Sequence, residues 1–197
     1  MCKKVTDYYK ELDSLIKAIK VTDNLGWEIS LDDAGVKVIE MIFNLPQAHN
    51  KLIFIGNGAS AAIASHQAVD FWKNGGIRAA AFNDPALLTC ISNDCGYQDV
   101  FVKPIEMFAD SGDILFAISS SGRSVNIINA VKAAVKKDCR VVTLSGFKED
   151  NSLRSLGDLN FYVPVSEYSY VEVIHHSICH FILEMIIEHK KSRIKNV

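Results

Sequence analysis

The chain has 197 residues, of which 49% are hydrophobic and 22% charged, and its formal net charge is −2. This length suits one ordinary domain, and the apolar share is large enough to fill a core without disulfides or structural metals. The charge balance lacks the basic excess typical of nucleic-acid-binding proteins, and no polybasic stretch favours a membrane surface. We therefore expect neither nucleic acid nor a membrane as a partner.

Cysteine usage and the N-terminus indicate the compartment. The count of five cysteines is odd and no pair has Cys-x-x-Cys spacing, which argues against a disulfide framework or a zinc ribbon. The N-terminal segment has no apolar signal core, and no apolar run reaches membrane-spanning length. These features predict a cytoplasmic protein with reduced thiols. The cysteines are Cys2, Cys90, Cys95, Cys139 and Cys179.

Two helices are expected before the first strand. Apolar residues recur at helical spacing over residues 3–20 and again over 31–44, where Pro46 closes the pattern. Both stretches place apolar residues on one face. We expect these faces to pack against a partner subunit.

From residue 51 onward, short apolar runs alternate with helical patterns. Several of the runs are apolar throughout, as in strands that are covered on both faces. The pattern predicts a single α/β domain over residues 1–197, with a mostly parallel five-stranded sheet flanked by helices on both faces. Residues 1–47 would form an N-terminal helical segment and 48–197 the α/β core. The expected strands are 51–55, 77–82, 113–118, 140–144 and 159–163, and a final long helix covers about 170–189.

The first segment that could bind a ligand is Gly56-Asn57-Gly58-Ala59-Ser60, between a strand and a helix. Glycine lets the backbone approach a ligand closely, and a helix N-terminus offers free N–H groups. The segment is neither a dinucleotide fingerprint nor a P-loop with its lysine. Alone, it fits a ligand loop or an ordinary tight turn.

A serine-rich loop, Ser119-Ser120-Ser121-Gly122-Arg123-Ser124, also follows an apolar strand and precedes a helix. One serine would serve as a helix cap. Four hydroxyls beside the unpaired N–H groups of a helix N-terminus are more than capping needs. We interpret the loop as a phosphate cradle. In an open α/β sheet, ligands bind beyond the carboxyl ends of the strands, where both loops lie.

Two helices carry groups that could hold Zn²⁺ or transfer protons. His66 and Asp70 are four residues apart, and Glu172, His176 and His180 repeat the same spacing, with His175 beside them. Each histidine alone is more often an ordinary core or surface residue. Asp94 is a further polar candidate for the site, although the composition of its segment is also typical of an ordinary loop.

The order of these motifs resembles that of the SIS-domain (sugar isomerase) phosphoheptose isomerases over nearly the whole chain. The matching segments are Gly56–Ser60, His66 with Asp70, Asn93–Tyr97, Gly112-Asp113, Ile118–Ser124, Val142–Gly146, and Glu172 with His180. The resemblance implies isomerisation of sedoheptulose 7-phosphate to D-glycero-D-manno-heptose 7-phosphate through an enediol. It also implies a cytoplasmic homotetramer with sites shared between subunits, a possible Zn²⁺ in each subunit, and a role in heptose supply for lipopolysaccharide or capsule.

Residue roles follow from the same resemblance. Asp70 and His180 fall at catalytic positions. His66, Asp70, Glu172 and His180 fall at positions suited to a metal. Substrate and phosphate contacts fall at Asn57, Ser60, Asp94, Ser119, Ser120, Ser121, Ser124 and Glu172.

Three positions within the matching segments depart from the family pattern. Asp70 stands where the family has glutamate, so its carboxylate is drawn back by about 1 Å, a displacement that can cost rate. Glu172 replaces the usual glutamine and adds a charge that suits a metal dication. Arg123 replaces a small neutral residue within the phosphate loop.

Two other functions fit the same motifs. A non-catalytic SIS module, binding a sugar phosphate or a protein, would keep the serine loop without needing His66, Asp70 and His180 on converging faces. An isomerase of another phosphosugar would use the same scaffold, because a fold does not fix a function. A dinucleotide-dependent oxidoreductase is disfavoured by the missing glycine fingerprint.

Overall fold

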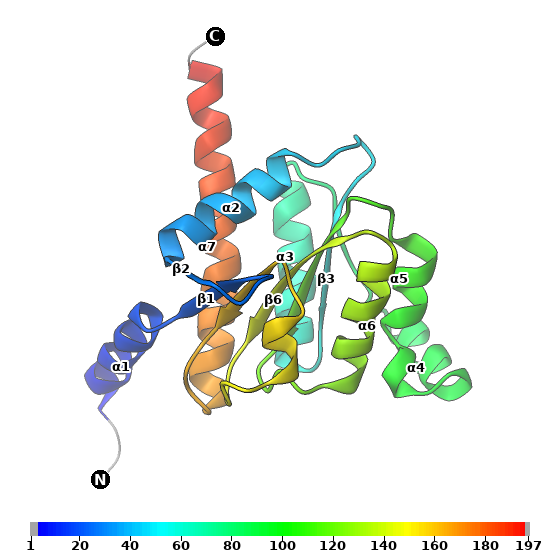
Figure 1. Ribbon diagram of the computed structural model, residues 1–197, viewed down its shortest axis with the longest axis horizontal. Coiled ribbons are helices and arrows are strands. Elements are labelled where there is room, and N and C mark those ends of the chain that lie inside the picture. Colours follow the sequence, from blue (N-terminus) through cyan, green and yellow to red (C-terminus); the bar gives the residue numbers. More distant parts are fainter. Residues whose placement is uncertain (1–3, 196–197) are drawn as a thin grey trace.

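The computed structural model describes residues 4–195, with side chains as far as Ser192; Cys2 lies outside this range (Figure 1). A seven-stranded sheet runs through the fold in the order β2-β1-β7-β6-β5-β3-β4. The strands are β1 Lys20–Asp23, β2 Glu28–Ile29, β3 Leu52–Gly56, β4 Ala79–Ala81, β5 Ile114–Ser119, β6 Arg140–Ser145 and β7 Leu159–Tyr162.

The five strands from β7 to β4 pair in parallel and coincide with the five predicted apolar runs. The prediction of a mostly parallel α/β sheet is confirmed, but the count of five strands was too low. β1 and β2 form a hairpin that adds to β7 in antiparallel orientation. This hairpin gives little apolar signal, because Val21 is the one buried residue of β1.

Helices cover both faces of the sheet (Figure 1). Helices α4 and α5 lie between β4 and β5 and were not predicted; the others agree with the expected helical stretches to within a few residues at most ends. The helices are α1 Val5–Lys17, α2 Leu31–Phe43, α3 Ala59–Lys73, α4 Pro85–Asp94, α5 Val102–Phe108, α6 Val125–Lys136 and α7 Tyr168–Lys195, with 3₁₀ turns at Tyr97–Asp99 and Ser152–Ser155.

The central strands bury both faces, in two separate clusters. On β3, Leu52 and Phe54 face the cluster that includes α2, α3 and α7, whereas Ile53 and Ile55 face the cluster that includes α5 and α6. This alternation follows from the two-residue period of a strand. Fully burying such a side chain contributes roughly 1.5–3 kcal/mol. The two clusters pack α3 and α7 on one face of the sheet and α6 on the other, so that these helices begin beside the loops at the carboxyl ends of the strands.

The two N-terminal helices differ from the expectation that both offer apolar faces to a partner. α2 buries Val38, Ile39 and Ile42 in the chain's own core, so its apolar face is already covered. α1 has no buried residue, and Val5 and Tyr9 are 73% and 62% exposed. Of the two helices, α1 therefore exposes the larger apolar side chains, whereas α2 exposes Val36 alone among the exposed large hydrophobic residues.

α7 is the one described helix that qualifies as a candidate membrane span when length and composition alone are considered. Residues Tyr168–Ser192 pass that test by length and composition, with a hydropathy of 1.3. Within the 18-residue window of this segment that gives the hydropathy value, 50% is buried inside the fold, as in the core helix of a folded domain.

Among the described cysteines, Cys90, Cys95, Cys139 and Cys179 are all free thiols. Burial raises the pKa of Cys139 to about 11 and that of Cys179 to about 12. Since the thiolate is the reactive form, these two behave as small apolar core residues.

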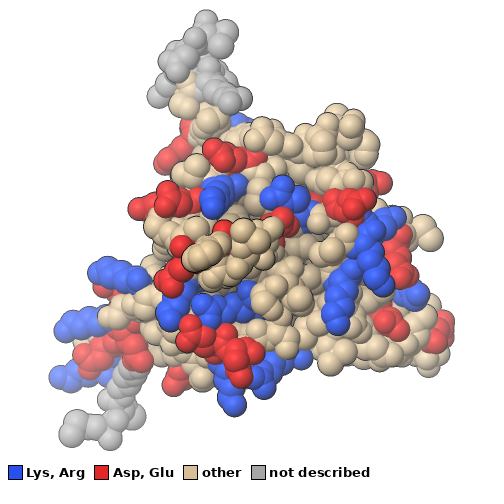
Figure 2. Space-filling view, in the orientation of Figure 1, with Lys and Arg blue, Asp and Glu red and all other residues tan. Residues whose placement is uncertain are grey.

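Basic and acidic side chains are interspersed over the face shown in Figure 2. Several meet as exposed ion pairs, such as Lys20 with Glu149 at 3.0 Å and Arg140 with Asp158 at 2.8 Å. Pairs of this kind contribute only about 0–1 kcal/mol each. The absence of a nucleic-acid partner stays a prediction.

Candidate functional site

The strand order reverses between β3 and β5. After β3 the chain moves outward to β4, then returns to β5 on the other side of β3 and continues to β6 and β7. The carboxyl ends of β3 and β5 lie side by side, with Gly56 opposite Ile118. Such a switch point opens a crevice between the two following loops, which is where ligands bind in open α/β sheets.

A cavity of about 250 Å³ fills this crevice. It brings together most of the predicted substrate residues, from both loops and from the start of α7. Its lining is Asn57, Gly58, Ala59, Ser60, Ser119, Ser120, Ser121, Ser124, Tyr168 and Glu172.

The first loop is shaped by glycine and fixed by amides. A Cβ at Gly56 would lie 2.5 Å from the backbone of Ser60, so only glycine lets the loop pass this close to α3. The Asn57 amide pairs with the Asn126 amide at 2.9 Å, and its Oδ1 accepts a 2.9 Å hydrogen bond from the Tyr97 hydroxyl. Asn57 is therefore held rigidly at the cavity wall.

The serine loop presents its hydroxyls and the start of α6 to the cavity. Ser124 occupies the cap position of α6, yet its side chain accepts no hydrogen bond from the helix. Its hydroxyl lies 3.4 Å from that of Ser119. Gly122 takes φ +60°, and a Cβ there would overlap the side chain of Asn151. This tight turn leaves hydroxyls and helix N–H groups available for an anion.

The cationic side chain of the serine loop, that of Arg123, does not enter the cavity. Arg123 points to Asp150, with a guanidinium-to-carboxylate distance of 2.8 Å, and neither Lys nor Arg lines the cavity in the described part of the chain. Among the described lining residues, Glu172 alone is charged. A phosphate would therefore bind through hydroxyls and the N-termini of α3 and α6 rather than through an ion pair.

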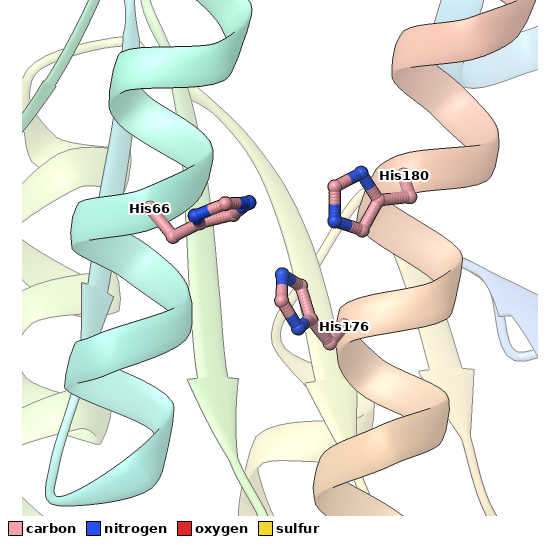
Figure 3. A group of neighbouring side chains, drawn as sticks. All are labelled: His66, His176 and His180. Atoms are coloured by element: carbon pink, nitrogen blue, oxygen red, sulfur yellow. The ribbon is translucent and has the colours of Figure 1, made fainter.

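A second group of side chains lies where α3 faces α7. Figure 3 shows the imidazoles of His66, His176 and His180 turned toward one another across the space between the two helices. Their nitrogen ligand atoms all lie within 4.8 Å of one another. The ring centroids of His66 are 4.9 Å from His176 and 5.4 Å from His180. The two helices therefore converge at these side chains, which residue spacing alone could not show.

Asp70 joins this group from α3. Its Oδ2 is 3.0 Å from His66 Nε2 and 4.0 Å from His180 Nδ1. Its Oδ1 accepts a 3.2 Å hydrogen bond from the amide of Asn74, which follows the end of α3. The Asn74 amide therefore holds one oxygen of the carboxylate, while the other oxygen faces the imidazoles of His66 and His180.

The adjacent histidines of α7 point to different places. His175 is fully buried, where its Nε2 lies 3.1 Å from the carbonyl of Ser145, and burial lowers its pKa to about 4. His176 faces the cluster. Burial, followed by the nearby His180 and His66, lowers the pKa of His176 as well. The structure therefore assigns His175 to the core and His176 to the site.

Comparison with known proteins identifies the family. The SIS domain family matches residues 7–146. Phosphoheptose isomerase from Histophilus somni (strain 2336) is 33% identical over 83% of this chain and 88% of its own length. The enzyme of that name from Pectobacterium atrosepticum is 35% identical over 79% and 85%. The chain belongs to the phosphoheptose isomerase family of SIS-domain proteins. The solved structure of phosphoheptose isomerase GmhA from Neisseria gonorrhoeae agrees, with a TM-score of 0.79 and 28% identity, covering 92% of this chain and 97% of that one.

Two residues do not lie where their predicted roles would require. Glu172, proposed as a metal ligand, lines the serine cavity and is not part of the group of converging imidazoles. Asp94, proposed as a substrate contact, ends α4 and does not line the cavity. Its carboxylate accepts from the Asn93 amide at 2.8 Å and contacts the Cys90 thiol at 3.6 Å.

Two residues enter the site to which the family resemblance gave no role. Tyr168, the first residue of α7, lines the cavity, with its ring against Phe147 at 4.8 Å. His176 lies between Glu172 and His180 on one face of α7. The four-residue spacing of these three gave a signal for His176, whereas nothing local distinguished Tyr168.

Proposed function

We propose that this chain interconverts sedoheptulose 7-phosphate and D-glycero-D-manno-heptose 7-phosphate. The observation that carries the proposal is the placement of an anion cavity and a carboxylate–imidazole cluster one after the other along α7. Glu172 lines the cavity, and His180 in the cluster lies eight residues on, a rise of about 12 Å. In a heptulose 7-phosphate, the reacting carbons and the phosphate likewise stand at opposite ends of a long chain.

The reaction moves a proton between C1 and C2 through an enediol, and so needs a base and an acid beside those carbons. Asp70 and His180 supply a carboxylate and an imidazole with facing atoms 4.0 Å apart. The Asn74 amide keeps the carboxylate turned toward the imidazoles. We assign the proton transfers to Asp70 and His180.

The serine cavity binds the phosphate in this proposal. Ser119, Ser120, Ser121 and Ser124 offer hydroxyls, Asn57 and Ser60 close the opposite wall, and Glu172 faces the sugar. Fixing the phosphate holds the distant carbonyl end in one place, which lowers the entropic cost of reaction. Asp94 stays a proposed substrate contact that this single chain does not bring to the cavity.

A divalent metal, Zn²⁺, fits the same cluster, because imidazole and carboxylate are its preferred oxygen and nitrogen ligands. Of the proposed ligands His66, Asp70, Glu172 and His180, the first, second and fourth lie together. When bound, the metal would polarise the carbonyl and enediolate oxygens.

We further propose a cytoplasmic homotetramer formed by one domain of residues 1–197, serving heptose supply for lipopolysaccharide or capsule. The exposed apolar side chains of α1, including Val5 and Tyr9, support a subunit contact. Asp94, at the end of α4, would reach a substrate if a neighbouring subunit completed the cavity.

Purified protein should turn over sedoheptulose 7-phosphate with a kcat/KM at least about 10-fold above that for a five- or six-carbon ketose phosphate, because a shorter sugar cannot span cavity and cluster. Turnover of both classes of sugar phosphate should be measured by chromatographic separation of aldose and ketose phosphates. The protein should be assayed as purified, after metal removal with a chelator, and after addition of Zn²⁺. Saturable binding of the sugar phosphate without turnover in any sample would support the non-catalytic function instead. A preference for the shorter sugar would support another phosphosugar isomerase.

A further inference from the structure

One ring nitrogen of His176 has no hydrogen-bond partner in the fold, although the ring packs against the imidazoles of His66 and His180. The Nε2 of His176 is buried and makes no hydrogen bond, although the side chain lies in a group with two other imidazoles. A buried polar atom without a partner costs about 1–3 kcal/mol. Among the described residues no side chain or backbone group satisfies this nitrogen, so it is available to a ligand of the cluster.

The donor set around His176 matches a metal. Ligands at bond lengths of about 2.0–2.1 Å in a tetrahedron stand roughly 3.3 Å apart. Asp70 Oδ2 lies 3.0 Å from His66 Nε2 and 4.0 Å from His180 Nδ1, close to that spacing on either side. The rings of His176 and His180 are 4.6 Å apart between centroids, so both can turn a nitrogen to one ion (Figure 3).

Position favours His176 over Glu172 as the fourth ligand. His176 is one helical turn nearer His180, whereas Glu172 lines the phosphate cavity. Three imidazoles with one carboxylate leave a net charge of +1 on a bound dication. Adding Glu172 instead would draw that carboxylate away from the cavity wall.

We propose that His176, together with His66, His180 and Asp70, forms a three-histidine centre for a divalent transition metal, in which His176 takes the place that the family pattern gives to residue 172. Glu172 then stays in the cavity as a contact to the sugar. The inference rests on the proposed function, because it assigns the metal of the same site, but its test does not use turnover as the readout.

Zn²⁺ affinity of metal-free protein, measured by competition titration, tests the assignment. His176→Gln should raise the Kd at least about 100-fold, since even the loss of an outer-shell partner costs 10–100-fold. The matched change Glu172→Gln, one turn away on the same helix, should alter the Kd less than about 3-fold. Circular dichroism of the metal-free variants checks that both remain folded.

X-ray absorption at the zinc edge gives a second readout, independent of affinity. The wild type should show three imidazole ligands and His176→Gln two. An unchanged Kd in His176→Gln, an equal loss in Glu172→Gln, or a wild type that binds no metal would overturn the proposal. Metal binding that depends on His176 without any isomerase activity would refute the proposed function alone, and turnover without such binding would refute the metal centre alone.

Discussion

Asp70→Asn is expected to lower kcat for sedoheptulose 7-phosphate by about 10²–10⁴, the range that a positioned general acid or base contributes. Asparagine keeps the size of the side chain and its contact with Asn74, but it cannot accept the substrate proton. Because Asp70 does not line the serine cavity, KM should change far less than kcat. Steady-state kinetics at saturating sugar phosphate separate the two effects.

Asp70→Glu is the matched control, since it restores the carboxylate reach that the family pattern has at this position. We expect kcat within about 10-fold of the wild type, because the charge is kept and the displacement is about 1 Å. If Asp70→Asn turned over at the wild-type rate, Asp70 would not handle the proton.

Ser121→Asp is expected to raise KM for the sugar phosphate at least about 100-fold. The variant places a negative charge in the cavity that we propose to bind the phosphate through hydroxyls and helix N-termini, with no Lys or Arg in its described lining. Two like charges 4 Å apart repel by about 4 kcal/mol at an effective dielectric constant of 20, and partial exposure to solvent reduces this.

The neutral control for this change is Ser121→Asn, which has nearly the size of aspartate without its charge. Its KM should rise by no more than about 10-fold. Binding of inorganic phosphate, followed by calorimetry, should show the same difference between the two variants. Equal effects of Asp and Asn would mean that bulk rather than charge acts, and that the phosphate binds elsewhere.

Much of the fold was predictable because the five parallel strands are buried on both faces and therefore appear as apolar runs. The β1–β2 hairpin was not, since β1 is held by pairing with β7, where Val21 lies opposite Phe161. Pairing between such distant segments leaves no local pattern. The strand count was too low for this reason.

The site shows the same division between local and long-range information. The serine loop was predictable, because a strand end, clustered hydroxyls and a helix start are adjacent in the sequence. Which of His175 and His176 faces the site was not, because the two side chains are adjacent on α7 and point about 100° apart. Packing of Ile174, Ile178 and Ile182 into the core fixes the rotation of the helix and decides it.

The placement of Asp94 was not predictable either. Its Asn-Asp-x-Gly-Tyr segment does reach the site, but through Tyr97, whose hydroxyl bonds Asn57. The carboxylate itself is bound to its own segment at Asn93. A sequence motif shows which residues are near one another, and the fold then decides which of them faces the ligand.

Isomerisation of sedoheptulose 7-phosphate in D₂O, followed by NMR, tests the central claim most directly. Proton transfer through an enediol held by Asp70 and His180 predicts an aldose heptose 7-phosphate that carries deuterium at C2, in the wild type and not in Asp70→Asn. A folded protein that binds the sugar phosphate, with or without Zn²⁺, but forms no aldose and exchanges no carbon-bound hydrogen would contradict it.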